Sequence, residues 1–261
     1  MDEDYQTYLN RVARTTLLET YNSQLQNLQE SPKFQPSSEG GRKPVPFPGY
    51  SVITPPPDED SQNQDFYQSL RLCQEQLLQL PLETDLIVPV PFASFHLTLA
   101  DLIWDNAYLY ASQNSDFEVQ LRSRIAEIFQ QYRQSLTQTN PSVWQILGFF
   151  VKPRSIAVCL IPKDESSYKQ ILQFRRTIYQ SSGLTALGIE QHYHFTAHIT
   201  LGYFGEISPH LDRDRLSTSL FELNEQWLEN SSQLVVHQAQ LRKFDDMTRY
   251  YRELDWPILD F

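Results

Sequence analysis

Cysteine and long apolar runs are scarce in this chain of 261 residues. Its only cysteines, Cys73 and Cys159, lack the close spacing of a metal or redox motif, which predicts two reduced, buried thiols in a cytoplasmic protein. No apolar stretch reaches the roughly 18–20 residues that a membrane span needs. The acidic start MDEDYQTYLN also lacks the basic and apolar segments of a secretory signal. We therefore expect neither a membrane partner nor export.

Basic residues are also in short supply. The chain has 21 Lys and Arg against 32 Asp and Glu, for a net charge of −11. Proteins that hold long nucleic acids neutralise many phosphates with clustered Lys and Arg, and no basic run occurs here. The expected partner is therefore a small anionic ligand or a single nucleotide end in a local pocket. The sequence leaves the oligomeric state open.

The chain does contain 40% hydrophobic and 13% aromatic residues, enough for one large domain or two fused lobes. Helical periodicity predicts helices over residues 4–30, 66–80, 117–136, 165–179 and 209–227. Strand patterns cover residues 50–54, 144–152, 155–161, 194–205 and 234–241, and two short strands or one bent strand over 85–104. Because these elements alternate without strict parallel units, we expect an α+β fold.

The composition divides the chain into three segments. Residues 1–32 are expected to form a helical extension that docks a partner, another copy of the chain, or the main domain. A stretch rich in Pro, Gly and Ser follows, and the main domain is expected to cover residues 33–245. Residues 246–261 are aromatic and charged without a clear period. This tail is expected to pack on the domain as a core cover or a lid.

One short motif occurs twice. SFHLTLAD at residues 94–101 aligns with TAHITLGY at residues 196–203, so that His96 and Thr98 correspond to His198 and Thr200. Alternate residues of a strand share one face, so each copy presents an imidazole beside a hydroxyl and an apolar face behind them. Two such strands that face each other predict a small polar site with two His and two Thr.

That set of side chains suits a phosphate ester. A neutral imidazole can take a proton from a nucleophile, and an imidazolium can give one to a leaving oxygen. The ordinary histidine pKa of about 6.5 makes both states accessible near neutral pH. The hydroxyls can donate hydrogen bonds to non-bridging phosphate oxygens. This chemistry requires neither a metal nor a cofactor.

The duplicated motif resembles the two H-x-[ST]-hydrophobic motifs of the 2H phosphoesterase superfamily, and Gly202 and Tyr203 extend the second match. The stretch KFQP…GGRKPVPFPGYSVI also resembles the start of the DUF1868 branch. The resemblance implies a bilobal, pseudo-twofold α+β fold similar to LigT, with one motif per lobe, a central cleft, and here an N-terminal helix in addition.

The resemblance also implies an activity. It is that of a metal-independent phosphodiesterase acting on a 2′,3′-cyclic phosphate or a related small nucleotide or RNA-end phosphodiester. His96 and His198 would be the acid–base pair, and Thr98 and Thr200 would hold phosphate oxygens. We expect His198 to be the base that activates water and His96 to be the acid. Resemblance to the DUF1868 branch does not imply a particular substrate.

Further side chains are candidates for binding substrate. His194 shares the face of the second motif if the strand is uninterrupted. Tyr203 faces the core in ideal alternation, but a bulge at Gly202 would turn it toward the cleft, where its ring could stack on a base. Arg154 and Lys152 flank a tight turn, where they could contact phosphate or lie in solvent.

Two alternatives stay open. Three imidazoles, those of His96, His194 and His198, could bind zinc. That site would leave the threonines unexplained, and neither motif contains a carboxylate. Alternatively, the cleft could bind a nucleotide or another phosphorylated ligand without cleaving it, although a pure binder has no need of two imidazoles in opposite protonation states.

Overall fold

The computed structural model describes residues 3–80, 85–136, 141–228 and 232–261. It has the α+β class that the sequence predicts. Most strands belong to two antiparallel sheets of five strands each. Each sheet carries one copy of the duplicated motif, so the two copies belong to different halves of the molecule.

The first sheet holds the first motif. Its path runs from β11 (Tyr250–Tyr251) through β10 (Gln238–Phe244) and β3 (Gly49–Ile53) to β5 (Thr98–Trp104), and β12 (Ile258–Asp260) also pairs with β10. Thr98 is the first residue of β5, so His96 lies just before the strand. The tail therefore contributes β11 and β12 to this sheet, whereas the sequence pattern predicted no regular element there.

The second sheet holds the second motif. Its order is β4 (Ile87–Pro89), β8 (His198–Phe204), β7 (Ser155–Pro162), β6 (Ser142–Lys152) and β9 (Gln233–Val236). The region 85–104 thus forms two short strands, β4 and β5, which lie in different sheets. This is one of the two arrangements that the sequence predicts.

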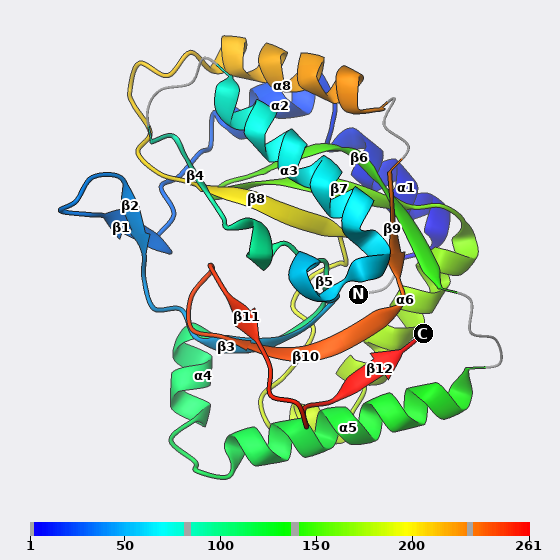
Figure 1. Cartoon of the computed structure of the whole chain (residues 1–261). Helices are drawn as coiled ribbons and strands as arrows, with labels where there is room; N and C mark the ends of the chain where they lie inside the picture. Colours follow the sequence, from blue (N-terminus) through cyan, green and yellow to red (C-terminus); the bar gives the residue numbers. More distant parts are fainter. Residues whose placement is uncertain (1–2, 81–84, 137–140, 229–231) are drawn as a thin grey trace.

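Helices cover the outer faces of the two sheets (Figure 1). α1 (Tyr5–Arg14), α2 (Leu18–Leu25), α3 (Gln64–Gln79) and α8 (Arg213–Leu228) lie on the side of the second sheet. α4 (Asp105–Ala111) and α5 (Phe117–Ser135) lie on the side of the first, and α6 (Glu165–Tyr179) contacts β5 and β6. The remaining elements are short: β1 (Phe34–Pro36), β2 (Arg42–Pro44), α7 (Ser182–Thr185) and the 3-10 turns η1 (Pro57–Glu59), η2 (Ser61–Asn63) and η3 (Phe92–Ser94).

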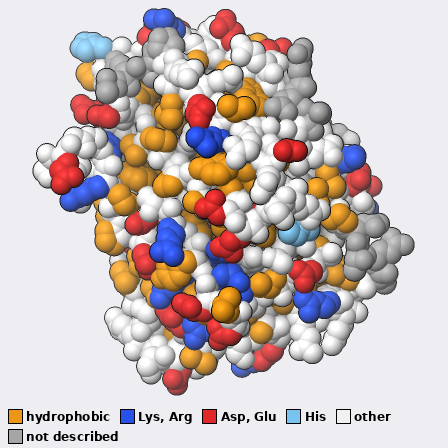
Figure 2. Space-filling model, viewed as in Figure 1, with side chains coloured by type: hydrophobic (Ala, Val, Ile, Leu, Met, Phe, Trp, Pro, Cys, Tyr) orange, Lys and Arg blue, Asp and Glu red, His pale blue; other side chains and the backbone are white. Residues whose placement is uncertain are grey.

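The surface mixes charges of both signs. On the face shown in Figure 2, Lys and Arg side chains lie interspersed with Asp and Glu. This distribution differs from the clustered basic side chains with which proteins hold long nucleic acids. Among the described helices, none combines the length and the apolar character that crossing a membrane requires.

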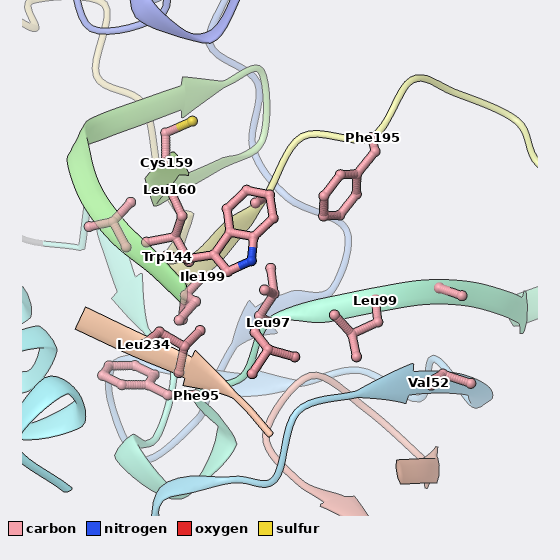
Figure 3. Packing of buried hydrophobic residues seen from close by; sticks show 14 of the residues in the cluster. Val52, Phe95, Leu97, Leu99, Trp144, Cys159, Leu160, Phe195, Ile199 and Leu234 are labelled. Carbon is pink, nitrogen blue, oxygen red and sulfur yellow. The ribbon is translucent and has the colours of Figure 1, made fainter. Parts of the chain in front are cut away.

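The apolar sides of both motifs lie in the core. Leu97, Leu99, Ile199 and Leu201 are fully buried, as the alternation within each motif predicts. Figure 3 shows Leu97, Leu99 and Ile199 in one cluster with Trp144. Burying one such aliphatic side chain stabilises the fold by about 1.5–3 kcal/mol. The apolar side therefore fixes each motif strand and leaves its other side available for polar residues. Both cysteines are buried and free, as expected.

The N-terminal extension differs from the single helix predicted over residues 4–30. It forms α1 and α2, with a break in which Leu17 is extended. The hydroxyls of Thr15 and Thr20 donate to backbone carbonyls near the end of α1, and such side-chain bonds compete with a continuous helix. Tyr8 and Tyr21 are fully buried and donate to carbonyls of the second sheet. The extension therefore packs on its own main domain.

Three other boundaries differ from the prediction. The strand expected over 194–205 begins only at His198, because side chains of α1 bind the backbone of residues 195 and 197. The helix expected from 209 begins at Arg213, where the Asp212 carboxylate accepts from the Arg215 N–H. The strand expected over 234–241 is two strands, β9 and β10, which belong to different sheets. Between them, His237 Nε2 lies 2.9 Å from Asp60 Oδ1.

Candidate active site

The two motifs meet in one cavity of about 500 Å³, which side chains from both halves of the molecule line. His96 and Thr98 enter it from the first sheet, and His198 and Thr200 from the second. All four side chains are half-buried. The cavity therefore holds two imidazoles and two hydroxyls, the set that the duplicated motif predicts.

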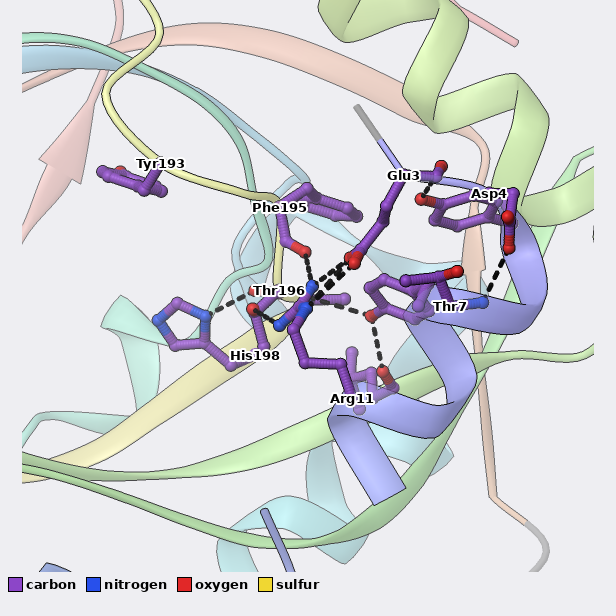
Figure 4. Close-up of polar contacts among 12 residues, drawn as sticks. Glu3, Asp4, Thr7, Arg11, Tyr193, Phe195, Thr196 and His198 are labelled. Carbon is purple, nitrogen blue, oxygen red and sulfur yellow. Dashed lines mark hydrogen bonds and ion pairs between the residues drawn. The ribbon is translucent and has the colours of Figure 1, made fainter. Parts of the chain in front are cut away.

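The same local contact orients both imidazoles. His96 Nδ1 lies 2.7 Å from the Ser94 carbonyl oxygen, and His198 Nδ1 lies 2.7 Å from the Thr196 carbonyl oxygen. A carbonyl oxygen can only accept, so Nδ1 of each neutral ring carries the hydrogen. In both rings, Nε2 is left with the lone pair that can take a proton. Figure 4 shows this contact for His198.

Burial keeps both imidazoles neutral. It lowers the pKa of His96 to about 4, with a smaller contribution from the Arg242 cation. Burial, together with a smaller contribution from the Lys152 cation, lowers the pKa of His198 to about 3. Both values lie below the ordinary histidine pKa of about 6.5, because removal from water and nearby cations disfavour the imidazolium. At neutral pH, each ring is therefore ready to act as a base.

Of the two basic residues at the tight turn, only one enters the cavity. Lys152 lines it, and its Nζ lies 3.3 Å from His198 Nε2. Arg154 is exposed beyond the turn, where its Nε donates to the Gln29 side chain at 3.1 Å. Arg154 is therefore removed from the candidate substrate contacts, because the turn directs it toward the N-terminal segment.

Tyr203 and His194 both line the cavity. A register shift in β8 explains the position of Tyr203: Thr200 and Gly202 pair with consecutive residues of β7, so Leu201 is an extra residue and the alternation slips by one. A Cβ at Gly202 would lie 2.7 Å from an Ile87 side-chain carbon, so glycine lets β4 approach. His194 reaches the cavity from the irregular segment before β8, not from a continuous strand.

Several cavity residues were not singled out from the sequence. Asp101 lines the cavity and accepts a hydrogen bond from the Tyr193 hydroxyl. The Tyr250 ring lies 4.1 Å from the His96 ring, measured between centroids. Lys33 enters from the segment before β1. Asp101 could have been noticed as a carboxylate within an apolar strand, whereas Lys33 and Tyr250 carry no such local signal.

An N-terminal arginine supports the second motif. Arg11 donates through Nη1 to the Thr196 hydroxyl at 2.7 Å and through Nη2 to the Phe195 carbonyl at 2.6 Å. The Glu3 carboxylate accepts from Arg11 Nε at 3.0 Å. Thr196 is also the residue whose carbonyl accepts from His198, so a chain of polar contacts joins α1 to that imidazole (Figure 4).

The alternative zinc site requires three imidazoles to converge. Across residues 3–80, 85–136, 141–228 and 232–261, no group of three or more His, Cys, Asp or Glu side chains is arranged to hold a metal ion. His96, His194 and His198 are among these residues, so the three rings do not converge as that alternative requires.

Comparisons with known proteins identify a similar fold and no family. No family model and no curated protein matches the chain. A conserved protein of unknown function from Agrobacterium tumefaciens is similar in structure, with a TM-score of 0.56 at 13% sequence identity over 81% of this chain and 86% of that chain. This likeness shows a shared fold. E. coli LigT in apo form aligns with a TM-score of 0.43 at 14% identity over 83% of this chain and 100% of that chain.

Proposed function

We propose that the protein is a phosphodiesterase of the 2H phosphoesterase superfamily. It hydrolyses a 2′,3′-cyclic phosphate or a related small nucleotide or RNA-end phosphodiester, and His96 and His198 are its acid–base pair. One observation carries the proposal: two imidazoles with the same Nδ1 anchor face one cavity, each beside a motif threonine. Resemblance to the DUF1868 branch remains a prediction from the sequence.

His198 is the base in this proposal. Its Nε2 lone pair takes a proton from water while the water oxygen forms a bond to phosphorus. The Lys152 ammonium 3.3 Å from this nitrogen disfavours the imidazolium, which suits a ring that starts the reaction neutral. A bound phosphate offers Lys152 a stronger acceptor than imidazole and thereby releases the lone pair of His198.

His96 is the acid. The negative charge of a bound phosphate raises the pKa of His96 from about 4 and favours the imidazolium. As the phosphorus–oxygen bond to the ribose breaks, His96 gives its Nε2 proton to the leaving oxygen. The products are a phosphate monoester and a free ribose hydroxyl. The hydroxyls of Thr98 and Thr200 donate to the non-bridging oxygens, where charge develops.

The decisive experiment measures hydrolysis of the four nucleoside 2′,3′-cyclic monophosphates in excess EDTA. We expect the wild type to turn over at least one of them, and His96→Ala and His198→Ala to abolish turnover. His210→Ala is the matched control, because His210 is exposed and outside the cavity. It should keep wild-type activity.

Three results would count against the proposal. A folded wild type that hydrolyses none of the four compounds rules out simple cyclic nucleotides and favours binding without cleavage. Activity that EDTA abolishes and a divalent metal restores contradicts the two-histidine mechanism. Activity that survives in either histidine variant removes that residue from the acid–base pair.

A further inference from the structure

Two lysine ammonium groups line the cavity without a carboxylate partner. Within the described part of the chain, neither Lys33 nor Lys152 lies within 4.0 Å of a carboxylate oxygen. The closest polar contact of Lys33 Nζ is the Met247 sulfur at 3.2 Å. Its other neighbours are aromatic, with the Phe47 ring centroid at 4.2 Å and the Tyr203 centroid at 5.2 Å.

These surroundings leave the charge of Lys33 incompletely compensated. Aromatic faces and a thioether attract an ammonium more weakly than a carboxylate does, and charges removed from water are ordinarily paired. Burial and, to a lesser extent, the Lys152 cation lower the pKa of Lys33 to about 8, whereas the Asp101 and Asp105 carboxylates act in the opposite direction. Asp101 is the carboxylate that lines the cavity, but it contacts Tyr193 instead of either lysine. An anion bound in the cavity would supply the missing partner.

Lys33 and His198 have different surroundings. Lys33 contacts Met247 and Phe47, which belong to a small apolar cluster that is separate from the main core. His198 instead lies beside Lys152 and the Phe150 ring. The cavity therefore has one cation beside His198 and a second cation in the small apolar cluster, whose Tyr250 ring contacts His96.

We propose that Lys33 binds a second phosphate of the substrate, while Lys152 serves the phosphodiester that is cleaved. This inference rests on the proposed function and narrows its substrate class. The substrate is a nucleotide that carries a 5′-phosphate monoester in addition to the diester at its other end. A monoester brings up to two negative charges and several strong acceptors to the ammonium, which is the pairing that lysine commonly makes with phosphate.

Equilibrium binding tests this subsite without turnover. The full chain is titrated calorimetrically with adenosine 3′-phosphate and with adenosine 3′,5′-bisphosphate, which differ only in the 5′-phosphate. One charge-assisted contact predicts that the bisphosphate binds about tenfold more tightly or better. Lys33→Met should reduce this ratio of dissociation constants to about 1–2, and Lys33→Arg should restore much of it. Lys43→Met, at an exposed position in the neighbouring β2, should keep the wild-type ratio.

The ratio of the two dissociation constants tests the subsite independently of the proposed activity. Equal affinities in the wild type, no measurable bisphosphate binding, or a ratio that Lys33→Met leaves unchanged would each overturn the subsite. If Lys33→Met does not fold, the wild-type ratio and Lys33→Arg still decide. A preserved ratio in a protein that hydrolyses no cyclic nucleotide would support the subsite and contradict the activity. Hydrolysis of cyclic nucleotides without any preference for the 5′-phosphate would support the activity and contradict the subsite.

Discussion

Each of the two motif strands contains a β-bulge that its own sequence pattern does not predict. In β5, Thr98 and Ala100 pair with adjacent residues of β3, so Leu99 is an extra residue. In β8, Thr200 and Gly202 pair with adjacent residues of β7, so Leu201 is the extra residue. Each bulge follows directly after the motif threonine and shifts the alternation by one. The residue three positions after each threonine therefore lines the cavity.

The two bulges bring different side chains into the cavity. The first directs the carboxylate of Asp101 into the cavity, and the second directs the ring of Tyr203. The contacts that hold the two histidine segments in place also differ between the halves. Ser94, which anchors His96, uses its hydroxyl on the nearby Pro91 carbonyl at 2.7 Å, whereas Arg11 from α1 holds the segment before His198. The halves thus share a local geometry that sets the histidine tautomer, and their differing neighbours allow the two rings separate roles.

The largest effect should come from removing the imidazoles. If His96 and His198 act as one acid–base pair, each alanine variant should lower kcat/KM by about 100- to 10,000-fold. The double variant should be little worse than either single variant, because residues that act as a unit are strongly non-additive. Steady-state kinetics on one cyclic nucleotide measures all three. Losses that multiply in the double variant would show that the two rings act in separate events.

The next effect concerns the hydroxyls. Thr98→Val and Thr200→Val keep the branched shape of the side chain but remove the donor. Each should lower kcat by about 100-fold if it stabilises charge on a non-bridging oxygen in the transition state. Measured kcat and KM for the two variants compare the halves directly. A loss confined to one variant would assign phosphate binding to a single half.

A smaller effect should come from removing the contacts that Arg11 of α1 makes to the segment before His198. Arg11→Met removes the contacts to Thr196 and Phe195, so we expect kcat to fall about tenfold as the His198 ring loses its fixed position. KM should change less, and Arg11→Lys should recover part of the activity. Arg14→Met, at an exposed position of the same helix, is the control.

Imidazole NMR distinguishes positioning from general destabilisation in these variants. Arg11→Met should shift the His198 ring signals while those of His96 stay in place. Equal shifts in both rings, or a fall in kcat no larger than that of Arg14→Met, would remove α1 from the site.

Local patterns explain which features the sequence predicts. The apolar periods of the helices and the alternation within each motif predict the buried backs of the strands, as Leu97 and Ile199 show. The bulges depend on the partner strand, which a single strand's pattern does not contain. The contact from Arg11 to Thr196 joins residues 185 positions apart, so only the folded chain brings them together. The sequence predicts one strand over residues 234–241 because the strand pattern continues through His237. In the structure, the chain changes sheets at this residue.

The smallest expected effect tests the charge difference between the two imidazoles. Lys152→Met removes a cation 3.3 Å from His198 Nε2, so the pKa of His198 should rise from about 3. Burial, the larger cause, remains, so this pKa should stay below the ordinary value of about 6.5. The pKa of His96, which the Arg242 cation lowers instead, should move less. NMR titration of the ring signals measures both values.

The same substitution has a consequence for stability. Because the native pKa of His198 lies below that of the unfolded chain, the unfolded state binds more protons as pH falls from about 6.5 toward 3. The free energy of unfolding therefore decreases over this range, and Lys152→Met, with a higher native pKa, should lose less. Denaturant unfolding at several pH values measures the difference. If the pKa of His198 does not rise, the ammonium does not bias the ring toward its neutral form, and the choice of His198 as base loses its electrostatic reason.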